Sequence, residues 1–196
     1  IQHPDFGNMC AEHDGASKSN TAAEPVTDVQ IYNATYLGSG MNSTNGKQEQ
    51  ILKLRENWAG AYNNSIFGDY NGYGVHVSGK YDPDSDDRLA DGSLVMLNNI
   101  WFNVNGYTMA DSIGKESYTQ AYLQDAANGN EETDPQLRSI GRGQDGQLDP
   151  RPATDGPAWE DLADYPAECD FYECVGYKGA FGLTNWAKGW TALDAY

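Results

Sequence analysis

Basic residues and long apolar runs are both scarce in this sequence. Its 196 residues include 12 Lys and Arg against 29 Asp and Glu, a formal net charge of −17. Binding to nucleic acid needs clustered Lys and Arg, so this balance argues against it and equally against adhesion to anionic membranes. No stretch approaches the ~18 apolar residues of a membrane-spanning helix, so we expect no membrane insertion. The acidity favours solubility, mutual repulsion between copies and cation binding.

Cysteine is also rare, with three residues in the chain. Cys169 and Cys174 enclose the segment D-F-Y-E, and a loop this short predicts a disulfide between them. Metal binding by the pair is disfavoured because no second Cys pair or His pair follows. The alternative is three free thiols. Cys10 is left over in either case and would be a free thiol or form an intermolecular bond.

The sequence begins Ile1-Gln2-His3-Pro4, and we expect no signal peptide from its first residues. We interpret this start as a processed mature product or as a solenoid that lacks its first coils. The composition is rich in Tyr, Asn, Gly and Asp and poor in Lys, which is typical of secreted β proteins. We therefore expect an extracellular or cell-surface location. Tripeptides of the N-x-S/T type would be glycosylated only in a eukaryotic secretory pathway, and they begin at Asn33, Asn42 and Asn63.

Five short apolar runs lie between Asp28 and Gly106, and each ends at Gly, Asn or Asp. Short runs of β-branched and aromatic residues bounded by turn residues predict strands. No helical spacing of apolar residues competes with this interpretation. The runs contain the segments V-Q-I-Y-N-A-T-Y-L-G, Q-I-L-K-L-R-E-N-W, A-Y-N-N-S-I-F-G-D-Y, Y-G-V-H-V-S and L-V-M-L-N-N-I-W-F.

The runs repeat along the chain. Leu54 and Val77 end similar segments 23 residues apart, and longer intervals contain the polar insertions Met41–Gln50 or Gly79–Gly92. Without those insertions the intervals approach a coil of roughly two dozen residues, which is the period of a solenoid. Strand-rich units favour a β-solenoid over a helical one. The sequence therefore predicts an all-β fold, a right-handed parallel β-helix of few coils.

Three asparagines occupy similar contexts in this repeat: Asn33, Asn64 and Asn99. Equivalent residues of successive coils in a β-helix stack about 4.8 Å apart. Asn tolerates the left-handed backbone conformation that a sharp corner needs, and stacked amides can bond one another along the row. We therefore predict an asparagine ladder at one corner. The alternative is that these residues are ordinary turn formers.

The chain divides into four parts within a single β-helix domain. Residues 1–27 are expected to form an N-terminal loop and 28–106 the coils, with surface loops at Met41–Gln50 and Asp82–Asp91. Residues 107–130 contain a predicted helix that begins at Asp111 or Ser112 and ends at Gly129. We expect it to lie against the coils or over their open end. Residues 131–196 form an irregular tail rich in Pro, Gly and aromatic side chains, which should pack on the coils or on a neighbouring subunit.

Several segments together resemble a family of secreted bacterial proteins: I-Q-H-P-D-F-G-N, N-A-T-Y-L-G-S-G, N-N-S-I-F, L-N-N-I-W-F, L-D-P-R-P-A and Y-K-G-A-F-G-L-T-N-W-A-K-G-W-T. These are large, predicted right-handed β-helix proteins, often described as lipoproteins or cell-surface proteins. The resemblance covers nearly the whole chain and corresponds to the C-terminal portion of such proteins. Its most specific part is the ending G-A-F…N-W…G-W-T. It implies fold and location but supplies no catalytic residues.

The best candidate for a functional site is the acidic loop that begins with Asp82-Pro83-Asp84-Ser85-Asp86-Asp87. Ca²⁺ takes six to eight oxygen ligands at about 2.4 Å, and carboxylates at alternating positions provide them. The loop lacks the Gly and Glu that a helix–loop–helix calcium motif has at its sixth and twelfth positions, where Ser93 occupies the twelfth. We predict a looser Ca²⁺ site, with a solvated acidic turn as the alternative. Its ligands would be Asp82, Asp84, Asp86 and Asp87.

Catalytic patterns are weak. Arg55 and Glu56, with Asp69, form the most suggestive trio for a polysaccharide-lyase-like β-helix, but an acidic chain would repel a polyanion. His76 alternates with two valines and should face outward, not act as a ligand. We therefore expect a non-enzymatic structural or adhesive protein that forms a homo-oligomer or filament. The alternative is a carbohydrate-active enzyme or carbohydrate-binding module with a glycan as partner.

Overall fold

The computed structural model describes residues 7–44, 46–111, 113–142, 147–166, 171 and 173–191. Within these residues most regular structure is strand, the main sheets are parallel, and two α-helices are present. The expected mostly-β class is therefore confirmed.

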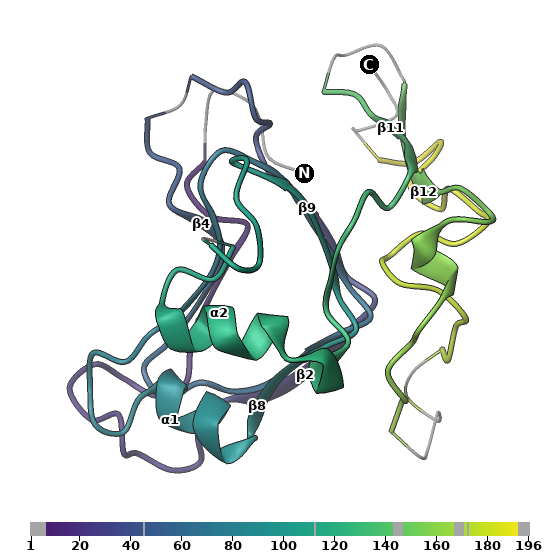
Figure 1. The fold of residues 1–196 in the computed structure, drawn as a ribbon. Coiled ribbons are helices and arrows are strands. Elements are labelled where there is room, and N and C mark those ends of the chain that lie inside the picture. Colours follow the sequence, from purple (N-terminus) through teal and green to yellow (C-terminus); the bar gives the residue numbers. More distant parts are fainter. Residues whose placement is uncertain are drawn as a thin grey trace.

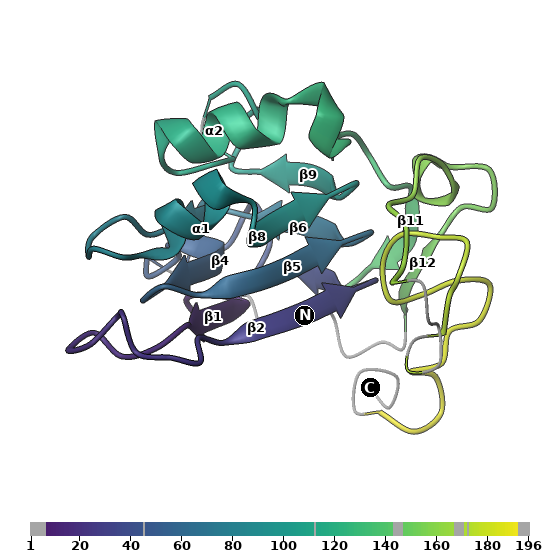
Figure 2. The same ribbon diagram turned by 90° about the horizontal axis from the view of Figure 1, so that it is seen from below.

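The chain visits three parallel sheets in turn, and each passage through the three is called a coil here. The sheets have the orders β1-β4-β7, β2-β5-β8 and β3-β6-β9-β10, so each strand pairs with the strand of the next coil. Figure 1 shows the sheets surrounding a common interior, and Figure 2 shows the coils stacked. The strands are β1 (Ala11–Asp14), β2 (Asp28–Tyr32), β3 (Thr35–Leu37), β4 (Gln50–Arg55), β5 (Ala59–Asn63), β6 (Ile66–Tyr70), β7 (Tyr73–Val77), β8 (Leu94–Leu97), β9 (Ile100–Val104) and β10 (Glu131–Glu132).

The predicted period is confirmed where no insertion interrupts it. Leu54 pairs directly with Val77, and Leu52 with Val75. All four side chains are fully buried in the interior. The coils begin earlier than expected, because β1 lies in the segment predicted to be a loop and pairs with β4.

Aromatic rings form a second row inside the coils. Tyr36, Phe67 and Trp101 are paired in register across β3, β6 and β9. The ring centroids of Tyr36 and Phe67 are 5.6 Å apart, and those of Phe67 and Trp101 are 4.5 Å apart. Stacked rings of this size supply much of the buried apolar area, and truncating one to Ala typically costs about 3–5 kcal/mol.

A surface loop was expected within the insertion Gly79–Gly92, but this segment also forms a helix. It contains helix α1 (Ser85–Asp91), whose Leu89 is buried. Asp84 caps the first turn, and Gly92, with φ of 81°, ends the helix in the left-handed conformation. A helix this short has no apolar period, so the capping residues are its main sequence signal.

Helix α2 (Ser117–Gln124) begins later than predicted, with Glu116 as its N-cap residue. The residues just before it are extended, since Gly114 forms a parallel bridge with Val75. The short 3-10 helix η1 (Ala126–Asn128) follows and ends at Gly129, as expected. Leu123 is buried, and the Met96 backbone N–H donates to the Tyr122 hydroxyl at 3.1 Å. Figure 2 shows α2 lying over one end of the stacked coils, which is one of the two positions expected for it.

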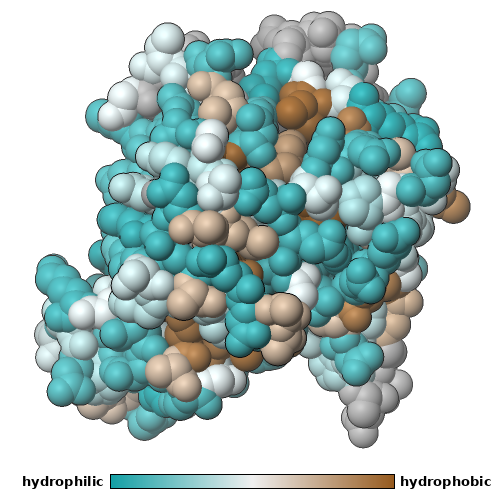
Figure 3. Space-filling view, viewed as in Figure 1, coloured by the Kyte–Doolittle hydropathy of each residue, from teal (hydrophilic) through white to brown (hydrophobic). Residues whose placement is uncertain are grey.

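The tail packs on the outer face of the β3-β6-β9-β10 sheet, as predicted, and forms a separate layer in Figure 1. It contains the antiparallel pair β11 (Leu137–Ile140) and β12 (Leu148–Pro152) and the 3-10 helix η2 (Pro157–Trp159). Lys178 is fully buried and its Nζ lies 2.9 Å from Glu131 Oε1, which joins the tail to β10. The face shown in Figure 3 is mostly hydrophilic, with separate smaller apolar areas.

Candidate functional sites

The two ends of the stacked coils differ. Helix α2 covers one end. At the other end, β1, β2 and β3 are the outermost strands of their sheets. No further strand pairs with their outer edges within the described residues. We call these three strands the β1–β2–β3 end. The outermost strand of a sheet can accept a strand from another chain, so this end is a candidate interface.

The interior is also less covered at this end. Val29 on β2 is 43% exposed, although Leu94 in the same row is fully buried two coils away. His13 packs against the aromatic core, and its ring stacks on Trp58 with the two ring centroids 5.1 Å apart. Its Nε2 lies 2.6 Å from the Tyr62 hydroxyl, and burial lowers the pKa of the imidazole. His13 therefore acts as a packed, hydrogen-bonded core residue.

The predicted asparagine row exists with one correction. Asn33, Asn64 and Asn98 occupy equivalent corner positions, with φ of 55°, 51° and 53°. Gly129 continues the row with φ of 61°. Asn99 therefore does not belong to the row, because it lies one position later. The left-handed backbone explains why Asn and Gly occupy this corner.

These side chains bind the tail; no hydrogen bonds join them to one another among the described residues. Asn64 donates to the Ala163 carbonyl at 2.9 Å and accepts from the Ala163 N–H at 2.7 Å. Asn98 donates to the Asp161 carbonyl at 2.7 Å, and Asn33 donates to the Tyr177 carbonyl. The corner is therefore a clamp on the backbone of the tail. We refer to these three residues as the asparagine clamp.

Asn99 has a separate structural role inside the corner. Its Oδ1 accepts from the Ser65 N–H at 2.9 Å, and its Nδ2 donates to the Tyr62 carbonyl at 2.8 Å. The same Nδ2 donates to Asn130 Oδ1 at 3.1 Å. Asn99 thus joins successive coils along the stacking direction, which is the role that the sequence assigned to the whole row.

The predicted calcium ligands serve the start of α1. Asp84 is fully buried, and its carboxylate accepts five hydrogen bonds, from Asn57, Ser78, Lys80, Tyr81 and Ser85. Burial alone would raise the pKa of Asp84, but these hydrogen bonds outweigh it and lower the pKa. The carboxylate is thus held ionised as a cap.

The other predicted ligands do not converge on Asp84. Asp87 completes the capping box by accepting from the Asp84 N–H at 3.0 Å. Asp82 is exposed. Burial of the Asp86 carboxyl, together with the nearby negative charge of Asp87, raises the pKa of Asp86. In the part of the chain that the structure describes, no three His, Cys, Asp or Glu side chains are placed to hold a metal ion. The calcium site remains a prediction.

The structure describes two of the three cysteines, Cys10 and Cys174. Cys174 is disulfide-bonded, while Cys169 lies outside the described residues. Cys10 is a free cysteine that packs against the core, and burial raises the pKa of its thiol to about 11. Such a thiol is protonated at neutral pH and therefore unreactive.

Within the suggestive trio, Arg55 Nε lies 3.8 Å from Glu56 Oε1, but Asp69 is not brought to this pair. Arg55 Nε lies 2.7 Å from Asp14 Oδ1, and this hydrogen bond raises the pKa of the guanidinium, which disfavours Arg55 as a general base. Asp69 lies on a different sheet, where it pairs with Arg142. The trio therefore supports no catalytic site.

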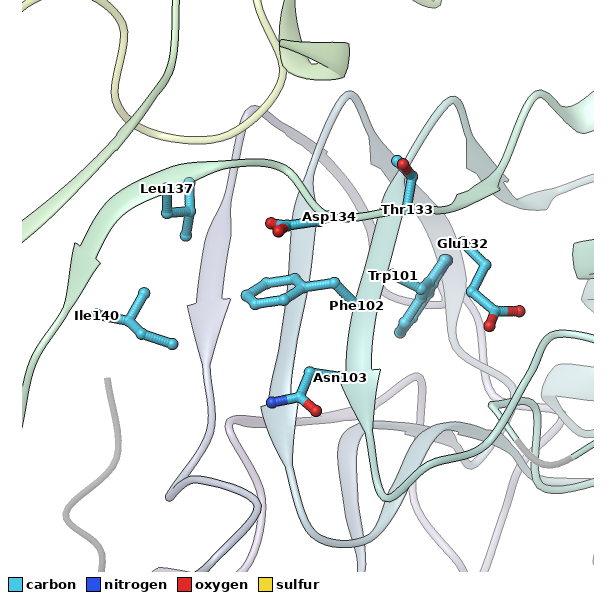
Figure 4. Close-up of a pocket in the computed structure, with 8 residues that line it drawn as sticks. All are labelled: Trp101, Phe102, Asn103, Glu132, Thr133, Asp134, Leu137 and Ile140. Carbon is cyan, nitrogen blue, oxygen red and sulfur yellow. The ribbon is translucent and has the colours of Figure 1, made fainter.

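A groove of about 560 Å³ lies between β9 and the segment that leads into the tail. Figure 4 shows Phe102 with Asp134 and Asn103 nearby and with aliphatic side chains on one side. Aromatic surface beside carboxylate and amide oxygens is suited to a neutral, hydroxyl-rich ligand. The lining residues are Trp101, Phe102, Asn103, Glu132, Thr133, Asp134, Leu137 and Ile140.

Comparison of the chain with protein-family models, with curated proteins and with solved structures finds no match in any of the three. Across the described ranges, neither helix has the length and apolarity needed to cross a membrane.

Proposed function

We propose that this chain is a secreted, non-enzymatic right-handed parallel β-helix that acts as a structural or adhesive element and self-associates through its β1–β2–β3 end. The observation that carries the proposal is the difference between the two ends. At one end β1, β2 and β3 are the outermost strands of three parallel sheets in the described part of the chain, while α2 lies over the other end. Another layer of strands added at these edges would extend the three sheets and cover the exposed Val29.

The position of α2 bears on the form of the assembly. Head-to-tail growth needs two complementary ends, and one end here carries a helix in place of strand edges. A contact between like ends closes after two copies. We therefore favour a two-fold pair over the filament that the sequence suggested.

The net charge sets the conditions for this association. Two chains of −17 repel each other, and salt screens this repulsion over distances beyond about 10 Å at 0.1 M. The proposed pair should therefore strengthen as ionic strength rises. Two copies that associate through strand edges and apolar side chains do not need opposite charges at their interface.

The extracellular location is part of the same proposal. The disulfide at Cys174 supports an oxidising compartment, because such bonds rarely persist in the cytosol. The resemblance to secreted bacterial β-helix proteins supports the same location and the right-handed winding.

Sedimentation velocity over a range of protein concentrations tests the association. We expect a monomer–dimer equilibrium that salt strengthens and that Val29→Lys weakens, because the variant places a charge at the exposed edge. Leu183→Lys makes the same kind of change on the tail, where Leu183 is 64% exposed, and should leave the equilibrium unchanged. A monomer at every concentration and salt level would overturn the proposal. The proposal would also be overturned if Val29→Lys and Leu183→Lys had the same monomer–dimer equilibrium.

Carbohydrate binding is a second candidate, and the groove in Figure 4 favours it. Phe102 offers an aromatic face, and Asp134 and Asn103 offer hydrogen-bonding oxygens beside it. Titration with neutral oligosaccharides tests this function. Loss of binding in Phe102→Ala would support it, whereas absence of binding at millimolar sugar would remove it.

A further inference from the structure

A second cavity of about 500 Å³ lies over the outer face of the β1-β4-β7 sheet. Its walls come from β4, β7, the segment after β7 and the start of α2, so residues far apart in sequence meet there. The side chains that concern ligand binding are His76, Glu116, Lys53, Lys80, Tyr81 and Tyr118.

Two polar atoms at this cavity are buried without a partner. His76 Nε2 lies 3.2 Å from Glu116 Oε1, and the two side chains are only 20% and 23% exposed. The second atom of each group, His76 Nδ1 and Glu116 Oε2, has no hydrogen-bond partner among the described residues. A buried polar atom without a partner destabilises the protein. Both atoms have less than 1 Å² of accessible surface, so a ligand reaches them only when these partly exposed side chains turn toward the cavity, and bonds to the ligand then satisfy both atoms.

The cavity is rich in positive charge for so acidic a protein. Lys53, Arg55 and Lys80 line it, which is three of the 12 basic residues of the chain. Lys53 and Arg55 are already paired with Glu12, at 3.4 and 3.0 Å. Lys80 has no ion pair within the described ranges, and its Nζ lies 5.2 Å from the Tyr81 ring centroid. The cavity therefore has room for one negative charge near Lys80.

The ionisation of the pair depends on pH. Burial raises the pKa of Glu116 to about 7 and lowers the pKa of His76 to about 4. Between these values both groups are neutral, and above them Glu116 becomes a carboxylate. The charged groups that face the pair are Lys53 on β4, Lys115 beside Glu116, Glu49 before β4, Asp84 and Asp86 at α1.

We propose that this cavity binds an acidic sugar unit that carries one carboxylate. The carboxylate meets Lys80, and ring hydroxyls bond to His76 Nδ1 and Glu116 Oε2, since a hydroxyl can donate and accept. Tyr118 and Tyr81 supply aromatic surface beside the sugar ring. Polyanionic stretches fit less well, because only one cation lacks a carboxylate partner. The inference is independent of self-association at the β1–β2–β3 end.

Protonation gives the proposal a specific signature. Ionised Glu116 would repel the carboxylate of the ligand, so affinity should fall on the order of tenfold as pH rises through about 7. Glu116→Gln keeps the shape of the side chain and removes the ionisation. The variant should therefore bind with little dependence on pH.

Isothermal titration with galacturonate and galactose, at about pH 5 and about pH 9, tests the proposal. We expect galacturonate to bind more tightly than galactose at the lower pH, and Lys80→Gln to weaken galacturonate on the order of tenfold. Lys18→Gln, at an exposed residue elsewhere, is the matched control and should bind as the wild type does. Melting curves of each variant exclude unfolding as the cause of lost binding.

Three outcomes would overturn the assignment. These are equal binding of galactose and galacturonate, no binding of galacturonate at millimolar concentration, and equal affinities in Lys80→Gln and Lys18→Gln. A pH dependence that survives in Glu116→Gln would remove the role given to that carboxyl.

Discussion

Asp84→Asn is the substitution whose effect the structure predicts most sharply. The Asp84 carboxylate accepts five hydrogen bonds, three of them at Oδ2 from the Ser78 hydroxyl at 2.8 Å and the backbone N–H groups of Lys80 and Tyr81 at 2.9 and 3.1 Å. An amide nitrogen at that position would face three donors with a donor of its own. The Ser78 hydroxyl can rotate, but the two backbone groups cannot.

The magnitude follows from those two groups. Each buried N–H left without an acceptor costs about 1–3 kcal/mol. Because Asp84 is fully buried, water cannot replace the lost acceptor. We therefore expect Asp84→Asn to lower the free energy of unfolding by about 3 kcal/mol, or the melting temperature by about 6–12 °C for a chain of this length.

Urea denaturation with and without EDTA measures the effect. Asp82→Asn is the control, since Asp82 is exposed and its substitution should stay within about 0.5 kcal/mol of the wild type. The lowered pKa of Asp84 also fixes the direction in which this stabilisation changes with pH. The stabilisation is present above the unfolded-state pKa of about 3.9 and disappears as pH falls through the lower folded value. Asp84→Asn within 0.5 kcal/mol of Asp82→Asn, as a rough threshold, would refute this account of the carboxylate.

Three further predictions concern the tail, the buried pair and calcium. Asn64→Ala should speed proteolysis of the tail, since it removes two hydrogen bonds to Ala163, whereas Asn42→Ala should not; equal rates would contradict the clamp. Glu116→Gln should stabilise the fold by about 2 kcal/mol at pH 8 and not at pH 4, because a carboxyl whose folded pKa is raised to about 7 destabilises the fold only above its unfolded pKa; a gain at both pH values in chemical denaturation would contradict this. Ca²⁺ should shift the melting temperature by less than about 1 °C, because the Asp84 carboxylate is already fully hydrogen-bonded. A larger shift that EDTA reverses would show that the predicted calcium site forms.

The period of the coils could be predicted from the sequence because β4 and β7 follow each other without an insertion. Leu54 and Val77 then carry the repeat directly. The asparagine row was harder to predict, since Asn63-Asn64 and Asn98-Asn99 are both Asn pairs. Counting back two residues from Ile66 and Ile100, which pair across β6 and β9, assigns Asn64 and Asn98 to the corner. The flanking apolar residue, not the Asn itself, is therefore the better marker of register.

The sites depend on contacts that sequence patterns do not encode. Helix α1 was missed because its polar sequence has no apolar period, although Asp84, Asp87 and Gly92 are recognisable capping residues. The cavity beside His76 could not be predicted, because Glu116 reaches it only when the segment before α2 pairs with β7. The clamp on the tail likewise joins residues about one hundred positions apart, such as Asn64 and Ala163.

Amide hydrogen exchange at low and high protein concentration tests the proposed association most directly. The account predicts that residues of β2 and β3 become more protected as concentration rises, while amides of α2 exchange at the same rate throughout. Exchange in β2 and β3 that does not depend on concentration, or protection that appears at α2, would contradict self-association through the β1–β2–β3 end.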